Sequence, residues 1–395
     1  MKPKQSNKND SHFGLYYHIP FCSYICHYCD FAKTARHDEG LRQKYIVDLM
    51  NHTNLWFAHP DIHDKQQFTS VFFGGGTPGI FGKELESLFD IFTPRLSPGA
   101  EVSLETNPDN ITPTRLREWQ ELGVTRVSVG VQSFQEKGLK FLTRPDQVSK
   151  VIDEVIALRS AFQNMNIDLI YGWPGQTTSM WEDDLRLAVD LGVPHISLYT
   201  LIYEPGIVIG RREARGLISQ TEDSYLADLY KFACDFLKES GYVHEEVSNW
   251  SKPGFSCRHN WLYWKGNSWL GIGAGAHGYL AELGDYGQRY AYGKNLKRLT
   301  KGQNNGFEAV NIEWENRDKT AWLLEQITCG LRCSNGIDTA FLASNTGLRF
   351  EPRAAVLRGL KEKSLVEYEQ NRLKLAPHEW FRETAWSLEV SMSFV

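Results

Sequence analysis

The sequence predicts an α/β protein: a partial (β/α)6 barrel followed by a smaller, helical C-terminal domain that resembles a winged helix. Six short β-rich segments alternate with longer amphipathic segments up to about residue 240. Such alternation is typical of parallel strands joined by right-handed helical crossovers. Polar motifs follow the ends of most of these strands. The C-terminal ends of barrel strands are where folds of this class place their chemistry.

The predicted strands are rich in β-branched and aromatic residues, and they span 15–19, 70–73, 101–105, 126–131, 166–170 and 195–201. Several of them are apolar throughout, which predicts that both faces of the sheet are covered. Amphipathic segments predict helices at 40–58, 83–95, 112–122, 147–162, 178–191 and 221–239. Six strand–helix units fall short of the eight in a closed barrel, so we expect an open one.

The pattern changes after about residue 241. Residues 241–305 are rich in Gly, Trp, Tyr and His, and we interpret them as an extension of the barrel. Helical periodicity then returns, for example at 320–329 and 353–363, and two short strands precede a last helix. The predicted organisation is a disordered leader at 1–13, the barrel with its extension at 14–305, and a C-terminal domain at 306–395.

Composition limits the classes of function. The chain has 395 residues, of which 42% are hydrophobic and 23% charged, as in soluble globular proteins. The net charge of −5 provides no basic field for nucleic acid. No apolar run approaches the ~20 residues of a membrane helix. Seven cysteines, an odd number, without a signal peptide predict a reducing, cytoplasmic location.

Three cysteines carry the most specific chemical signal. Cys22, Cys26 and Cys29 form a C-x3-C-x2-C loop directly after the first predicted strand. Three thiolates can hold three corners of a [4Fe–4S] cluster and leave the fourth iron open to a small molecule. A structural zinc site would need a fourth ligand, for which His18 and His27 are the candidates. No second cysteine half-site with good spacing is visible, so we favour the cluster.

Five motifs in order give the chain a family resemblance: HIPFC with CHYCDF, FFGGGTP, LETNP, GVQSF and IDLIYGWPGQT. They resemble radical S-adenosylmethionine (SAM) enzymes, and more narrowly the HemN/HemW group of oxygen-independent coproporphyrinogen oxidase and its relatives. The resemblance implies that the three cysteines bind the cluster and that SAM chelates its open iron. It implies the following SAM-binding positions: Tyr16, Gly75, Gly76, Thr77, Glu105, Gln132, Arg144 and Asp168.

The chemistry of these side chains agrees with that role. Arg144 is a planar, permanently charged donor that suits a carboxylate. Asp168 suits ribose hydroxyls, as acidic residues do in other nucleotide sites. Glycines at 75 and 76 let the main chain approach a ligand closely. For each single residue the alternative is an ordinary buried hydrogen-bonding group.

Two departures from the oxidase pattern and one further motif indicate which branch of the family the chain resembles. In the family that the chain resembles, the oxidases carry a long N-terminal extension, whereas about fourteen residues precede the first strand here. The resemblance also implies a further cysteine two positions after the third, where this chain has Phe31. Residues 257–264, CRHNWLYW, resemble the HNxxYW motif of the heme-binding branch. This implies His259 as the axial heme ligand, with Cys257 as a competing thiolate. A packed core histidine is the alternative.

The resemblance therefore implies a protein that binds heme as cargo and delivers it to apo-hemoproteins of the respiratory chain. The alternative is oxidative decarboxylation of coproporphyrinogen III in heme biosynthesis, with SAM cleaved to a radical. A flavodoxin or ferredoxin is the expected reductant, and a homodimer is a possibility that the family suggests. Nucleic acid is not an expected partner.

Three other features of the sequence are weaker indications of function. Gly273, Gly275 and Gly278 match G-x-G-x-x-G, but their flanks supply no βαβ unit for a dinucleotide. His277, inside this motif, is either a second metal or heme-proximal residue or simply structural. Cys329 and Cys333 lie on or near a predicted helix end and are interpreted as structural thiols.

Overall fold

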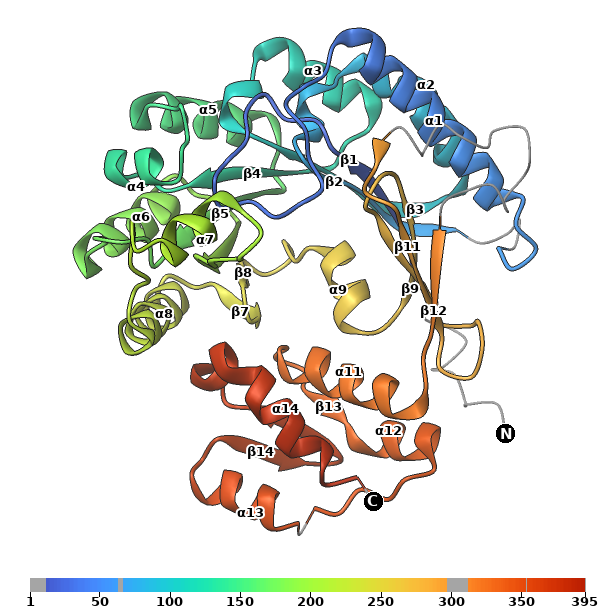
Figure 1. The fold of residues 1–395 in the computed structure, drawn as a ribbon, viewed down its shortest axis with the longest axis vertical. Coiled ribbons are helices and arrows are strands. Elements are labelled where there is room, and N and C mark those ends of the chain that lie inside the picture. The colour runs from blue at the N-terminus through green and yellow to red at the C-terminus, as the bar shows by residue number, and fades with distance from the viewer. Residues whose placement is uncertain (1–11, 63–66, 297–311, 353, 395) are drawn as a thin grey trace.

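A single large sheet organises the protein. The computed structural model describes residues 12–62, 67–296, 312–352 and 354–394 (Figure 1). The sheet has twelve strands, and its six central strands are parallel and pair in chain order. They are β1 (Phe13–Ile19), β2 (Phe68–Gly75), β3 (Leu96–Thr106), β4 (Arg126–Gln132), β5 (Met165–Tyr171) and β6 (His195–Thr200). The predicted partial (β/α)6 barrel is confirmed.

Helices cover the outside of this barrel (Figure 1). They are α1 (Glu39–Phe57), α2 (Glu86–Phe92), α3 (Pro113–Leu122), α5 (Val148–Ala161), α6 (Thr178–Asp190) and α8 (Asp223–Glu239). The helix predicted at 83–95 is reduced to α2 between two 3-10 turns, the second of which contains Pro94. Two short helices, α4 (Glu136–Phe141) and α7 (Val208–Ala214), were not predicted.

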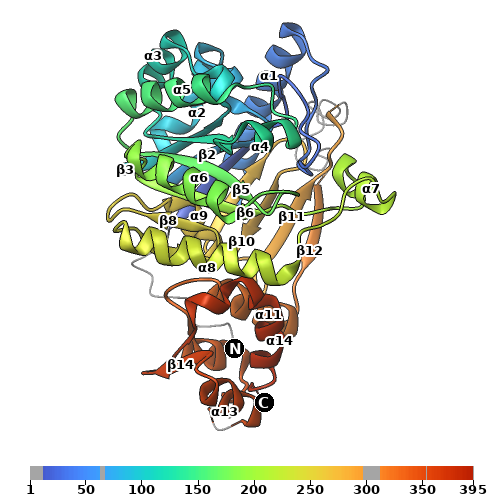
Figure 2. The same cartoon turned by 90° about the vertical axis from the view of Figure 1, so that its left-hand side faces the viewer.

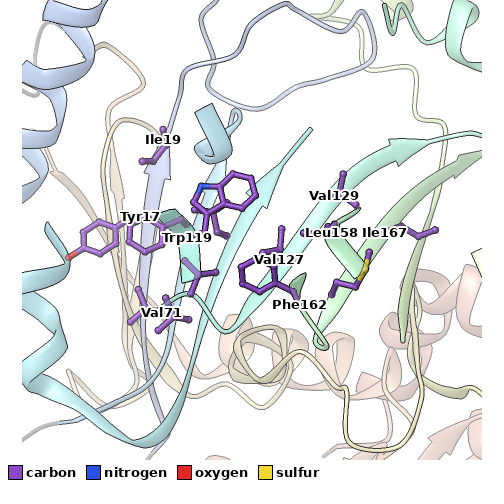
Figure 3. Close-up of a cluster of buried hydrophobic side chains, with 14 of the residues drawn as sticks. Tyr17, Ile19, Val71, Trp119, Val127, Val129, Leu158, Phe162 and Ile167 are labelled. Carbon is purple, nitrogen blue, oxygen red and sulfur yellow. The ribbon is translucent and has the colours of Figure 1, made fainter. Parts of the chain in front are cut away.

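The two faces of the central strands differ in polarity. Residues that point outward, such as Tyr17, Val71 and Val127, pack with Trp119 and Phe162 in the layer between sheet and helices (Figure 3). The alternate residues are largely polar and buried, and they include Ser70, Glu101, Ser103, Arg126, Asn166, Ser197. The prediction that both faces of the sheet are covered is confirmed, since every residue of β4 is buried. The description of several strands as apolar throughout was wrong, because the inner face of the barrel carries polar groups.

The extension after residue 241 completes both edges of the sheet. β9 (Ser268–Ile272) pairs parallel to β1, and β10 (His277–Leu280), β11 (Gln288–Tyr292) and β12 (Ile312–Asn316) continue from it in antiparallel order. β8 (Asn249–Ser251) and β7 (Val243–Glu246) extend the sheet beyond β6. A strand rather than a helix follows the G-x-G-x-x-G segment, in agreement with the absence of a βαβ unit there.

The short helix α9 (Arg258–Trp264) lies in the space between the two edges of the barrel (Figure 1). It packs against β1, β2 and β9. A Cβ atom on Gly14 would lie 2.4 Å from Leu262 Cδ1, so the glycine in β1 makes room for this helix. Glu101 accepts hydrogen bonds from the backbone N–H groups of Arg258 (3.1 Å) and His259 (3.3 Å). The carboxylate therefore satisfies donors at the start of α9 that the helix itself leaves unpaired.

The C-terminal domain has its own core below the barrel (Figure 2). Its elements are α11 (Lys319–Leu331), β13 (Ile337–Asp338), α12 (Thr339–Thr346), α13 (Ala355–Glu362), β14 (Val366–Glu369), β15 (Arg372–Leu375) and α14 (Glu383–Ser391). A small sheet in the order β13-β15-β14 joins these helices as in a winged helix. Backbone contacts dock the domain on the barrel, among them Val247 N–H to Arg332 O (2.9 Å).

Two predicted boundaries fall partly outside the described residues. The leader predicted at 1–13 is described only from residue 12, and β1 begins at Phe13. The boundary predicted between 305 and 306 lies outside the described ranges. Strand β12 still pairs with β11, so the large sheet continues to Asn316.

Candidate cluster and SAM site

The three cysteines lie on a loop that follows β1 and is fixed by backbone hydrogen bonds. Cys22 N–H donates to Thr34 O (3.0 Å), and Thr34 N–H donates to Pro20 O (2.7 Å). The loop after β2 is tied to the same segment, because Thr77 N–H donates to Phe21 O (2.7 Å). The two loops are therefore held side by side at one end of the barrel.

Glycine is required where these two loops meet. A Cβ atom on Gly76 would lie 2.7 Å from Phe21 O and 2.9 Å from Ile19 O, which are backbone atoms that cannot rotate away. Gly75 has a φ of +112°, in the region that favours glycine. The glycines thus permit the close approach of the two loops to each other, and the approach of SAM to this main chain stays a prediction.

A pocket of about 430 Å³ opens at this end of the barrel. The three cysteines line it, together with seven of the eight positions predicted for SAM: Gly75, Gly76, Thr77, Glu105, Gln132, Arg144 and Asp168. The sequence argument that polar groups at strand ends would converge is thus confirmed. Tyr16 does not line this pocket. Its hydroxyl is hydrogen-bonded to His18 Nδ1 (3.1 Å), and its ring lies deeper in the barrel.

The donor set fits an iron–sulfur cluster. All three thiols are free, Cys22 is buried, and Cys26 and Cys29 are partly exposed. The described residues hold no group of three His, Cys, Asp or Glu placed to bind one metal ion. A cluster takes its thiolates on separate iron atoms, so its ligands need not converge on one point. His18, a candidate zinc ligand, has both ring nitrogens in hydrogen bonds, to Tyr16 and to Ala32 O (2.8 Å).

Two carboxyl groups form the acidic side of the pocket. Burial, and to a lesser extent the charge of Asp168, raises the pKa of Glu105 to about 7. Glu105 also accepts a hydrogen bond from Gly75 N–H (3.0 Å). Burial likewise raises the pKa of Asp168, although Ser197 and Asn166 oppose that shift through hydrogen bonds. A cation that binds here would favour the ionised form of both groups.

Arg144 forms the basic side of the pocket. Its guanidinium donates to Asn107 Oδ1 (3.1 Å) and to Gly130 O (2.8 Å), and it lies 3.9 Å from Cys26 Sγ. The carboxylate of Asp146 forms an ion pair with this guanidinium, at 3.4 Å from Arg144 Nε. The guanidinium is thus held in place next to a cysteine of the loop, where it can pair with an anionic group of a ligand.

Some lining residues were not singled out from the sequence. They include Tyr24, Tyr28, Asn107, Tyr199, Ile202 and Glu204. Asn107 links both sides of the pocket, because it accepts from Arg144 and donates to Thr77 Oγ1 (3.1 Å). Its place in the LETNP motif was a usable signal. Ile202 comes from a loop after β6, and no motif in the sequence pointed to that loop as part of a site.

His259, predicted as a heme ligand, lies in the barrel interior. Its side chain is 0% exposed, and both ring nitrogens have partners: Ser70 Oγ (2.7 Å) and Tyr263 OH (2.8 Å). Burial lowers its pKa to about 3, so the ring is neutral. This is the geometry of a packed core histidine. Ligation of iron would require one of the two hydrogen bonds to break.

The other candidate residues lie away from the cysteine pocket. Cys257, the alternative heme ligand, is buried beside Glu101, and burial raises the pKa of its thiol to about 12. His277 is exposed at the start of β10. Cys329 lies in the last turn of α11, and Cys333 lies just beyond it.

Similar proteins agree with this geometry. The model of the radical SAM superfamily matches residues 16–188. The heme chaperone HemW of Lactococcus lactis is 35% identical over 328 residues, which cover 82% of each chain. The heme chaperone HemW of Synechocystis is 31% identical over 377 residues, 94% of this chain and 90% of that one. The structure of Escherichia coli coproporphyrinogen III oxidase (HemN) has the same fold, with a TM-score of 0.77, 20% identity and coverage of 97% and 90%.

Proposed function

Because the chain belongs to the HemW family of radical SAM proteins, we propose that it is a heme chaperone that binds a [4Fe–4S] cluster, SAM and heme. In this proposal it delivers heme to apo-hemoproteins of the respiratory chain. The observation that carries the proposal is the joint placement of three free thiols and seven predicted SAM positions in one pocket, in a chain whose relatives are named heme chaperones.

Each group has a role in this site. Cys22, Cys26 and Cys29 hold the cluster, whose open iron binds the amino and carboxylate groups of SAM. Arg144 pairs with the carboxylate, and Glu105 and Asp168 take the cationic and ribose parts. We further propose a cytoplasmic location, a flavodoxin or ferredoxin as reductant, and a homodimer. Among the described residues, no helix is long and apolar enough to cross a bilayer.

Replacing Arg144 with lysine is expected to weaken SAM binding by about tenfold, because an ammonium cannot keep the fixed contacts to Asn107 and Gly130 and also pair with a carboxylate. Anaerobic equilibrium dialysis with labelled SAM measures the affinity. The matched control is Arg186→Lys, an exposed residue of α6. Unchanged SAM affinity in Arg144→Lys at full cluster content would remove this residue from the site.

The function itself is tested by an anaerobic titration of the cluster-loaded protein with hemin, followed by transfer to an apo-cytochrome. We expect saturable binding near one heme per chain, and heme transfer that follows the amount loaded. Coproporphyrinogen III should be left unchanged in a parallel assay, because Phe31 stands where the resemblance implies a cysteine in the oxidases. Absence of heme binding together with decarboxylation of coproporphyrinogen III would replace the proposal with the oxidase alternative.

Heme ligation by His259 stays a prediction from the HNxxYW motif. Because Tyr263 and Ser70 occupy its two nitrogens, Tyr263→Phe should strengthen heme binding if His259 is the ligand, and His259→Ala should abolish it.

A further inference from the structure

Each of the three cysteine thiols has a hydrogen-bond donor beside it. The donors are a hydroxyl, a guanidinium, and a backbone N–H group together with a lysine ammonium. In the order Cys22, Cys26 and Cys29, they belong to Thr77, to Arg144, and to Phe31 with Lys33. Hydrogen bonds to the sulfur ligands and nearby charge are among the factors that set the reduction potential of an iron–sulfur cluster.

The donors at Cys22 and Cys26 belong to one network that also faces the SAM side of the pocket. Arg144 can only donate, so Asn107 accepts from it through Oδ1 (3.1 Å). The amide nitrogen of Asn107 therefore donates to Thr77 Oγ1 (3.1 Å), which leaves the hydroxyl proton of Thr77 for Cys22. A substitution of Thr77 or Arg144 would alter this network and the predicted SAM contacts together.

Lys33 is the cation at the third cysteine. Its ammonium donates to Phe31 O (3.3 Å) and to Cys29 O, and its side chain lines the cysteine pocket. Burial raises the pKa of the Cys29 thiol, and the charge of Lys33 opposes that shift, as does a hydrogen bond from the backbone of Phe31. The ammonium therefore lies beside the sulfur of Cys29 as well as beside its carbonyl oxygen.

No carboxylate neutralises this ammonium within the part of the chain that the structure describes, since Lys33 forms no ion pair there. Asp30 lines the same pocket with the opposite charge, but it is exposed, so water and salt screen it strongly. Lys33 is half-buried against the cysteine loop, and its field at the three sulfur atoms is screened less.

We propose that Lys33 raises the reduction potential of the cluster that Cys22, Cys26 and Cys29 hold. The inference rests on the cluster site of the proposed function and adds a residue that tunes it. An iron–sulfur core with three thiolates is anionic, and reduction by one electron makes it more so. A fixed ammonium beside one thiolate stabilises the reduced form more than the oxidised form. Reduced flavodoxin or ferredoxin would supply the electron, and no bond of the protein forms or breaks.

The test is a potentiometric titration of the full-length, cluster-loaded protein without SAM, followed by the electron paramagnetic resonance signal of the reduced cluster. Lys33→Gln removes the charge but keeps a donor for the two carbonyl groups. It should lower the equilibrium constant for reduction about tenfold, which is a fall in potential of about 59 mV for one electron. Lys33→Arg keeps the charge and should titrate near the wild-type potential. The matched control is Lys83→Gln, an exposed lysine outside the pocket that pairs with Glu121 (3.0 Å), and it should leave the potential unchanged.

The outcomes separate the role of Lys33 from the cluster site itself. If the wild-type protein takes up no cluster, the proposed cluster site and this inference both fall. A wild-type potential in Lys33→Gln, at full iron and sulfide content, would overturn the inference and leave the cluster site intact. Equal shifts in Lys33→Gln and Lys33→Arg would also overturn it, because they would show that the geometry of the loop matters and the charge does not.

A second neutral variant covers the case in which Lys33→Gln holds no cluster. Lys33→Met is then titrated in its place, and a fall in potential of the same size is expected. Loss of the cluster from both neutral variants, with a full cluster in Lys33→Arg, would assign the charge to retention of the cluster and overturn the tuning role.

Discussion

Replacing Cys26 with serine is expected to abolish cluster binding while the fold is retained. A cluster that keeps one iron open for SAM has only three protein ligands, so the loss of one thiolate leaves two. A serine hydroxyl does not ionise near neutral pH and is a poor substitute for a soft sulfur ligand. Cys26 is partly exposed, so the substitution leaves the hydrophobic core intact. Iron and acid-labile sulfide per chain, after anaerobic reconstitution, measure the result.

The matched control is Cys329→Ser, because Cys329 is also partly exposed but lies in α11, outside the cysteine pocket. This variant should hold as much iron and sulfide as the wild-type protein. Full cluster content in Cys26→Ser would contradict the proposed set of ligands. Stoichiometric zinc with no sulfide in the wild-type protein would contradict the cluster itself and favour the zinc site.

The core of the barrel was predictable because its strands carry a local signal. Alternate residues such as Tyr17, Val71 and Val127 are apolar, and they form the layer under the helices. The motifs at the strand ends also predicted the pocket, since parallel strands bring their C-terminal ends to one edge. Pro94 limits a helix that was predicted too long, which is a local effect that the sequence already contained.

Long-range pairing was not predictable in the same way. β9 pairs with β1 across more than half of the chain, as Phe13 opposite Ser268 shows. The strands of the extension are short, so periodicity says little about them, and the partner of β9 is distant in the chain. A cavity of about 770 Å³ between α8 and β7 is closed by Pro377 and Phe381 of the C-terminal domain, which no local pattern could bring to α8.

His259 shows that a sequence motif can identify a residue without revealing the contacts of its side chain. The resemblance singled out the residue correctly as one in a distinctive segment, but a sequence does not reveal what surrounds a side chain. Ser70 on β2 and Tyr263 one turn along α9 occupy its two nitrogens, and only the fold places Ser70 there. A role that requires a free nitrogen is therefore decided by packing rather than by residue type.

The affinity for SAM is expected to rise with pH up to about 7 and then level off, because of Glu105. Its pKa is raised from 4.5 to about 7, so below pH 7 the carboxyl of the SAM-free protein is protonated and neutral. SAM carries a sulfonium group, and its positive charge favours the ionised carboxylate. Binding below pH 7 must therefore release a proton, and the affinity should fall by about tenfold for each pH unit below about 6.

Glu105→Gln separates this linkage from a general effect of pH. The variant should bind SAM more weakly at pH 8 and with a smaller dependence on pH, because Asp168 remains the only ionisable carboxyl of the pair.

The substitution Glu105→Gln should also stabilise the SAM-free protein at pH 8. Folding of the wild-type chain costs free energy as pH rises from 4.5 to about 7, since the unfolded state ionises Glu105 more readily. A variant with weaker SAM binding and a higher melting temperature, at equal cluster content, would show that this buried carboxyl serves the ligand at the expense of the fold. An unchanged pH profile in the variant would assign the linkage to another group.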